Sequence, residues 1–527
     1  MAETKDGIGV TAARLVSSLY AGQLVGVLIT ATTFILLTRL LGPGNYGLYT
    51  FALGFSLLIG SIQGFGVGTY FNKILPEFGK RKDKDKVLKA IASGYLILVP
   101  IALALTFLGI ALSPYIANVL FRHLGVAPLT LMLASASFFF SVIVYITTHG
   151  LIGFTKGKLA SVVTVSLDAI QLFLSVGLVL LGYGVNGAMA GLLIGYIAGC
   201  AISLYLLYDV LSGYGMVHFK MPSKADLKKA FSFSAPIGAN NVLNYSVQNF
   251  SILYVSFFIT KELLGNLGAA LRGLNFIAVF HNTMSTALIP LFAKSSLTKN
   301  SREARADYNK MLLYAILVSM PLIIYIGVLA KPGVVLLLSS AYANTSFYLS
   351  LIAFGTVINI FQFYIVSLLL AKGYARKLLK YNALSIIIQY TLVIAVTPFY
   401  GALGMIVTLF IIGGILDDVI FIYLAKKVLD MKFEYRKLAA LFASNMLLAL
   451  PLSLALLVAN PVLSLLTGLI MLFIAYPPLL AVFRVLNNTD IELMENISKR
   501  ITILERPVGW FMAYLRLLTN TKGAGNG

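Results

Sequence analysis

Residues 88–112 read LKAIASGYLILVPIALALTFLGIAL, an apolar run in which Lys89 is the one charged side chain. A helix of this length rises about 37 Å, which exceeds the ~30 Å hydrocarbon core of a bilayer. A helix also satisfies its own backbone hydrogen bonds, as a lipid environment requires. The preceding residues 80–86 read KRKDKDK, a run suited to the anionic headgroups of the cytoplasmic leaflet. The stretch therefore predicts a membrane-spanning helix.

Similar apolar stretches recur when the chain is divided at charge clusters, Pro/Gly turns and polar runs. The predicted spans are 16–40, 46–71, 88–112, 126–151, 160–182, 185–208, 234–259, 264–292, 310–330, 344–371, 378–398, 402–425, 437–459 and 461–483. They lack the alternation of barrel strands and are too long for them. We expect an all-α polytopic membrane protein with fourteen transmembrane helices.

The composition excludes other classes of protein. Of 527 residues, 59% are hydrophobic and 11% charged, whereas a soluble protein carries about 25% charged residues. A net charge of +21 would suggest nucleic acid as a partner in a soluble chain, but a mean hydropathy of +0.91 argues against this. The single cysteine, Cys200, excludes a disulfide framework. The start MAETKDGIGV lacks a secretory pattern, so we expect that no signal peptide is removed.

The cationic residues predict the topology. Thirty-five of the 40 Lys and Arg residues fall in the termini or in the connections after even-numbered spans. Because cationic flanks resist translocation, both termini are predicted to be cytoplasmic, in the cell membrane. Residues 1–15 form the N-terminal segment. In the tail 484–527, apolar residues at helical spacing predict an amphipathic helix at about 488–520, lying on the inner leaflet or on the bundle.

Short matches indicate an internal repeat. Tyr183-Gly184-x-x-Gly187 precedes the sixth span, and Tyr400-Gly401-x-x-Gly404 precedes the twelfth, at an offset of 217 residues. Gly47 pairs with Gly268 at a similar offset. Helices 1–6 would then repeat as helices 7–12. The predicted divisions are an N-lobe (16–208), a cytoplasmic linker (209–233), a C-lobe (234–427) and two added helices (437–483).

A repeat of six spans is parallel, with its pseudo-two-fold axis along the membrane normal. Two six-helix lobes in this relation would leave a cleft that rocking opens to alternate sides. This arrangement favours a transporter over a channel.

Polar residues cluster in the seventh span. Asn241, Asn244, Tyr245 and Gln248 are spaced i, i+3, i+4 and i+7, which places them on one helix face. One reading is hydrogen bonding between helices. The other is a wet, substrate-facing surface, because amides and phenols suit sugar hydroxyls. Gln23 in the first span adds a polar position opposite it in the repeat.

The eighth span contains Arg272, about 12 Å from its outer start, with Asn275 one turn further on. An arginine stays charged, so it must meet a carboxylate, a helix C-terminus or an anionic ligand. The carboxylates within spans are Asp168, Asp417 and Asp418. A structural ion pair and an anion contact both remain open. No acidic residue lies in the first span, which weakens a cation-coupling site there.

The sequence has no nucleophile and base arrangement, metal-spaced His/Glu set or phosphate-binding loop. We therefore expect a protein that is not an enzyme, with no catalytic residues, no metal site and no cofactor.

The first span closes in Thr38-Arg39-Leu40-Leu41-Gly42-Pro43-Gly44-Asn45-Tyr46-Gly47-Leu48-Tyr49. This stretch resembles the Arg-Leu-Leu-Gly-Pro-x-x-Tyr-Gly-Leu-Tyr motif of the polysaccharide-transport branch of the multidrug/oligosaccharidyl-lipid/polysaccharide exporter superfamily. The second-half motif is matched loosely around Gly268 and Arg272, with Ala270 in place of the family tyrosine.

The resemblance implies a flippase that moves polyprenyl- or dolichyl-diphosphate-linked oligosaccharide from the cytoplasmic to the outer leaflet by alternating access. It implies that Arg272, and also Arg39, engage the diphosphate. Membrane lipids and a coupling ion are further possible partners; nucleic acid is not, and we expect a monomer. The main alternative is a cation-coupled multidrug exporter of the same superfamily, and the remaining one is a scaffold or a glycan enzyme.

Overall fold

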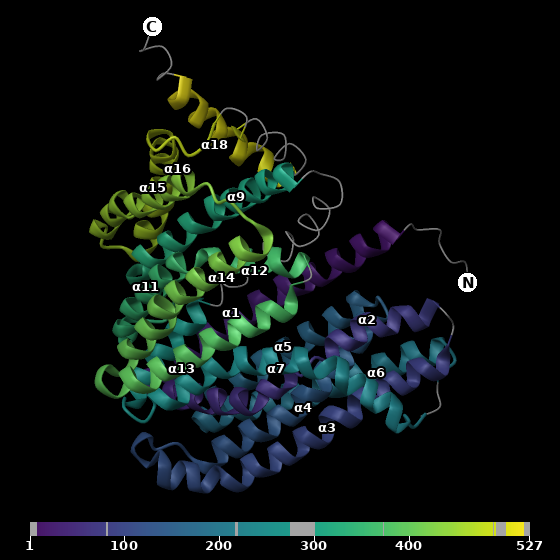
Figure 1. Ribbon diagram of the computed structural model, residues 1–527. Coiled ribbons are helices and arrows are strands. Elements are labelled where there is room, and N and C mark those ends of the chain that lie inside the picture. Colours follow the sequence, from purple (N-terminus) through teal and green to yellow (C-terminus); the bar gives the residue numbers. More distant parts are fainter. Residues whose placement is uncertain are drawn as a thin grey trace. The chain divides into compact units, whose positions relative to one another are not determined.

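The computed structural model describes residues 8–80, 83–216, 220–274, 301–372, 374–487, 490–491 and 502–520. Every regular element within these ranges is helical (Figure 1). The α-helices are α1 (Ile8–Gly60), α2 (Val67–Lys80), α3 (Lys84–Tyr115), α4 (Pro128–Gly153), α5 (Gly157–Leu178), α6 (Gly184–Gly213), α7 (Lys224–Val255), α9 (Ser301–Val328), α10 (Ala330–Leu337), α11 (Ala343–Ile358), α12 (Ile360–Ala371), α13 (Ala375–Ile406), α14 (Gly413–Leu429), α15 (Tyr435–Leu454), α16 (Pro461–Val482) and α18 (Thr502–Asn520).

The described residues contain nine helical stretches that are long and apolar enough to cross a membrane. Three of them, of 42, 57 and 53 residues, are long enough for two passes each. The prediction of an all-α polytopic membrane protein is therefore confirmed. The number fourteen stays a prediction, because much of the eighth predicted span lies outside the described residues.

Glycines interrupt the long helices where the sequence predicts turns. The first predicted span and residues 46–60 of the second form α1, which kinks at Gly42 (φ 68°, ψ 170°). Gly184 (φ 52°, ψ −133°) and Gly401 (φ 55°, ψ −131°) share one backbone conformation, which residues with a Cβ atom rarely adopt. These two glycines are the ones that the repeat places at equivalent positions.

One break is not visible in the sequence. The predicted span 344–371 consists of two helices, α11 and α12, separated at Asn359 (φ −87°, ψ 18°). Neither proline nor glycine occurs at this point. The break frees backbone groups in the middle of a span, and these groups need partners.

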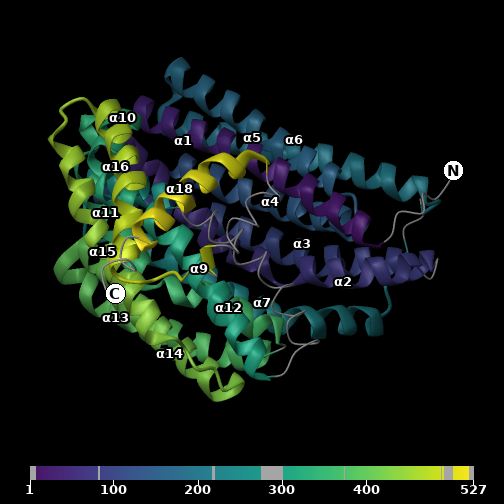
Figure 2. The same cartoon turned by 90° about the horizontal axis from the view of Figure 1, so that it is seen from above.

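The chain divides into two compact units, of which unit 1 comprises Met1–Gly268 and Tyr390–Met405. Helices α5 and α6 lie side by side in it (Figures 1 and 2), and its core gathers apolar residues such as Val67, Phe71 and Phe138. Helix α7, expected at the start of the C-lobe, packs against α1 and α3 within unit 1. The boundaries of the two lobes stay a prediction.

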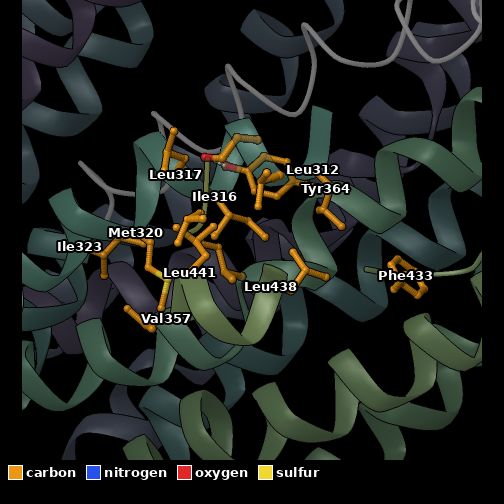
Figure 3. Packing of buried hydrophobic residues seen from close by; sticks show 14 of the residues in the cluster. Leu312, Ile316, Leu317, Met320, Ile323, Val357, Tyr364, Phe433, Leu438 and Leu441 are labelled. Atoms are coloured by element: carbon orange, nitrogen blue, oxygen red, sulfur yellow. Dashed lines mark hydrogen bonds between the residues drawn. The ribbon is translucent and has the colours of Figure 1, made fainter. Parts of the chain in front are cut away.

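Unit 2 comprises Ala269–Gln389 and Ile406–Gly527. Its core is built mainly from α9, α11, α12, α14, α15 and α16. Figure 3 shows Leu312, Ile316 and Met320 of α9 gathered with Leu438 and Leu441 of α15. Of the amphipathic tail predicted at about 488–520, the structure describes the helical residues 490–491 and the helix α18, which runs from Thr502 to Asn520. Its Met512 and Leu515 are buried in the core of unit 2, so this helix packs on the bundle.

Candidate functional site

Helix α7 carries the predicted amide face and has a well-defined N-terminal start. The Asp226 backbone N–H donates to the Ser223 hydroxyl at 3.2 Å, and the Ser223 backbone N–H donates to the Asp226 carboxylate at 3.0 Å. This reciprocal capping box satisfies backbone donors at the helix end. The hydrogen bonds from Ser223 lower the pKa of Asp226 below its ordinary value. The cap thus fixes where α7 begins and which way its faces point.

The amide face of α7 lies between two buried contacts. Gly238 packs on Phe65, and Ile252 packs on Gly54 of α1. These two residues lie about 21 Å apart and within about 40° of each other around the helix. Tyr245, on the same side and between them, is 59% exposed. The two ends of this face pack against other parts of unit 1, yet the middle of the face, at Tyr245, is not packed.

The four predicted residues of this face differ in exposure. Asn244, Tyr245 and Gln248 are exposed, and Asn241 is half-buried. The Asn244 Nδ2 donates to the Asn240 carbonyl oxygen at 2.9 Å, one turn back on the same helix. The structure therefore brings the four together on one helix face. Their role in binding stays a prediction.

A second polar group in unit 1 was not predicted as a site. Asn72 of α2 lies with its Nδ2 3.4 Å from Nδ1 of His149 on α4. The ring of Tyr145 lies 4.5 Å from that of His149, centroid to centroid. Lys73, next to Asn72, is exposed and lies with its Nζ 4.9 Å from the Phe233 ring centroid. The pairing of α2 with α4 is a tertiary contact, and sequence spacing gives no signal for it.

Two predicted residues lie on α1. Gln23 and Arg39 are both exposed, and Arg39 lies just before the kink at Gly42. In the chain, Arg39 opens the motif on which the resemblance depends. Neither residue has an assigned ligand, so both stay predictions.

Arg272 lies in unit 2, near the end of the described helical residues 261–274. Its side chain is half-buried, beside the fully packed Ala270 and Leu271. Within the described residues, no carboxylate lies in ion-pair distance of its guanidinium. Asn275 lies outside the described residues.

The two carboxylates of α14 have other partners. The buried Asp417 accepts hydrogen bonds from the Ser385 hydroxyl and from Gln389 Nε2, the latter at 3.1 Å. Asp418, also buried, accepts from the Gln362 backbone N–H at 2.8 Å. Gln362 is in the first turn of α12, so Asp418 satisfies a donor that the break at Asn359 sets free.

The third candidate carboxylate is Asp168 on α5, in unit 1. It is half-buried, and a Cβ placed on Gly26 of α1 would lie 3.1 Å from its Oδ2. The close approach of α1 and α5 therefore holds Asp168 against the backbone of the first span.

Comparisons with known proteins agree with this architecture. The structure of the lipid II flippase MurJ in an inward closed conformation matches with a TM-score of 0.70 and 16% identity, covering 89% of this chain and 98% of that one. An inward-facing multidrug resistance MATE family transporter of the MOP superfamily matches with a TM-score of 0.65 and 16% identity, covering 77% and 94%. At such identities the likeness shows the fold. No curated protein sequence matches the chain.

The helical fold and its apolar spans define a multi-pass membrane protein with the fold of the MOP superfamily, the multidrug/oligosaccharidyl-lipid/polysaccharide exporters. The profile of the polysaccharide biosynthesis protein family matches residues 12–296, more than half of the chain. The chain therefore belongs to that family. The MatE profile matches residues 236–395. The superfamily expected from the sequence is confirmed.

Proposed function

We propose that the protein is a flippase that moves a lipid-diphosphate-linked oligosaccharide from the cytoplasmic to the outer leaflet by alternating access. The family supports a role in polysaccharide biosynthesis, and the fold is shared with a lipid II flippase. The observation that carries the proposal is Arg272, a half-buried cation within a predicted span that has no carboxylate partner among the described residues. Such a cation suits the diphosphate, because an arginine binds phosphate oxygens through two parallel hydrogen bonds.

The amide face of α7 suits the sugar part of the substrate. Asn241, Asn244 and Gln248 offer donors and acceptors, and Tyr245 offers a flat ring with a hydroxyl. The exposure of Tyr245 and Gln248 supports contact with a polar ligand over burial as interhelical glue. The lipid tail would stay in the bilayer during transport.

The polar group of α2 and α4 suits an earlier step of transport, the entry of the substrate headgroup from the inner leaflet. Lys73 lies midway along α2, two residues beyond the end of the second predicted span at residue 71, and follows Asn72, whose Nδ2 lies near His149. An exposed cation at this level would attract an anionic headgroup that enters from the inner leaflet. It would add to the contacts of Arg272 without replacing them.

The experiment is flipping of a lipid-diphosphate-linked oligosaccharide in vesicles reconstituted with purified protein. Arg272→Ala and Arg272→Glu should abolish flipping while the protein stays monodisperse and helical, and Arg272→Lys should retain part of it. Arg122→Ala is the matched control, because Arg122 is exposed and lies outside the predicted spans. Undiminished flipping in Arg272→Glu would remove this residue from the mechanism.

A cation-coupled multidrug exporter is the second candidate. The MATE fold and the MatE profile favour it, as do the buried Asp417 and Asp418, since acids within spans often bind ions or protons. Drug resistance conferred by the wild-type chain and lost in Asp168→Asn or Asp417→Asn would support it. Flipping that is retained in the same two variants would support the flippase.

A further inference from the structure

An apolar cavity of about 440 Å³ lies between α12, α14 and α15 in unit 2. This volume falls within the ~300–1,000 Å³ typical of small-molecule sites. Its lining includes Phe361, Ile422, Phe433, Tyr435, Leu438 and Phe442. The described lining residues are aliphatic or aromatic, with the Tyr435 hydroxyl as the single polar side-chain group. The chemistry of the wall therefore selects a hydrocarbon.

The cavity lies in the cytoplasmic half of the membrane, in the predicted topology. Ile422 precedes the end of α14 at Leu429 by seven residues, and Phe442 follows the start of α15 by seven. Both ends face the cytoplasm, so these side chains lie about 10 Å below them. Tyr435 at the start of α15 is 51% exposed. The cavity is therefore at the depth of lipid chains and has a mouth near the headgroups.

Two exposed cations, Lys426 and Arg436, neighbour Tyr435 at this mouth. The Lys426 Nζ lies 4.9 Å from the centroid of the Tyr435 ring, which lines the cavity. Arg436 follows Tyr435 in the chain, and both cations are exposed. The neighbouring Lys437 is neutralised by Glu434, with Nζ 2.9 Å from the carboxylate. Within the described residues, Lys426 and Arg436 take part in no ion pair.

We propose that the cavity binds one acyl chain of an anionic phospholipid of the cytoplasmic leaflet, whose headgroup phosphate contacts Lys426 and Arg436. An apolar chamber at acyl-chain depth with two unpaired cations at its mouth matches both parts of such a lipid. A zwitterionic phospholipid would fill the cavity equally well and would gain less at the mouth. The site uses none of the residues of the proposed function, so either proposal can fail alone.

The single tryptophan makes a direct test possible. Trp510 is replaced by Phe, and Phe442→Trp then places the one fluorophore in the cavity wall. The full chain is reconstituted in phosphatidylcholine vesicles. One set contains added brominated phosphatidylglycerol and the other contains added brominated phosphatidylcholine, and quenching of the tryptophan fluorescence by bromine is measured. Brominated phosphatidylglycerol should quench at several-fold lower mole fraction than brominated phosphatidylcholine. Tyr435→Trp is a second reporter should Phe442→Trp not fold.

Two controls complete the design. Lys426→Gln with Arg436→Gln should abolish the several-fold preference, because each cation near an anionic lipid contributes up to about fivefold. A tryptophan at the exposed Leu447 of the same helix should be quenched by both lipids alike. Equal quenching of the cavity reporter by the two lipids, or a preference that survives the double variant, would overturn the proposal. So would displacement of the brominated lipid by a polyprenyl diphosphate at equimolar amounts, since the cavity would then take the transported lipid.

Discussion

Gly47 of α1 and Gly265 pack against each other in a reciprocal way. A Cβ on Gly47 would lie 2.9 Å from the Gly265 backbone nitrogen, and a Cβ on Gly265 would lie 2.9 Å from the Gly47 backbone nitrogen. The Cβ on Gly47 would also overlap the Lys261 carbonyl oxygen, and the Cβ on Gly265 would overlap the Pro43 carbonyl oxygen. Lys261 lies four positions before Gly265, and Pro43 lies four positions before Gly47, so each glycine meets the carbonyl oxygen one turn before the other glycine. A contact that is unchanged when its partners are exchanged implies a local two-fold axis.

This helix crossing predicts that two substitutions far apart in the sequence lower the stability of the protein equally. Gly47→Ala and Gly265→Ala should each destabilise the protein by about 1–3 kcal/mol, because neither backbone can accept a methyl group without moving. Thermal unfolding in detergent should show similar decreases in Tm for both. Gly177→Ala is the control, because Gly177 of α5 has no atom within 4 Å of its Cβ position. An unchanged Tm for Gly47→Ala, or a large difference between the first two variants, would contradict the reciprocal contact.

Asp418 is predicted to stabilise the break between α11 and α12. Asp418→Leu leaves the Gln362 N–H without a partner in a buried site, which should cost about 1–3 kcal/mol. Asp418→Asn keeps an acceptor oxygen and should unfold close to the wild-type Tm. We also expect it to keep transporting, because the role assigned here needs an acceptor and no charge. Loss of transport in Asp418→Asn at an unchanged Tm would instead indicate ion coupling.

The cap of α7 predicts a pH dependence outside the membrane. Because hydrogen bonds from Ser223 lower the pKa of Asp226, its ionised form stabilises the helix start above the ordinary pKa of about 3.9. This contribution is lost as the pH falls through the lowered folded value. Hydrogen-exchange protection at residues 224–228 should decrease over that pH range. Asp226→Asn should show lower protection at neutral pH and no such step.

The physics of the bilayer explains which features the sequence predicts. Spans such as 88–112 are predicted because each must satisfy its own backbone, and Tyr183-Gly184 and Tyr400-Gly401 are predicted because their backbone conformation favours glycine. The break at Asn359 is missed because the acceptor for the freed Gln362 N–H, Asp418, is 56 residues away in the chain.

The sequence predicts less of the candidate site than of the fold. Helical spacing places Asn241, Asn244, Tyr245 and Gln248 on one face, but it does not give the exposure of that face. The pairing of Asn72 with His149 depends on how α2 meets α4, and neither segment contains a signal for the other. Local periodicity therefore predicts faces, and tertiary packing decides which of them stay open.

The open middle of α7 predicts that Gln248 meets water. The single cysteine, the buried Cys200, is replaced by Ser, and Gln248→Cys is then treated with a membrane-impermeant maleimide in vesicles. We expect labelling, because an exposed amide between two packed contacts of one face borders an aqueous path. Phe173→Cys on α5 is the control: it is 75% exposed within an apolar span, and a side chain that faces lipid should stay unlabelled. Excess lipid-linked oligosaccharide should slow the labelling of Gln248→Cys if the face binds sugar. An unlabelled Gln248→Cys beside a correctly folded protein would show that the face meets lipid or protein, and would remove the α7 amides from the proposed site.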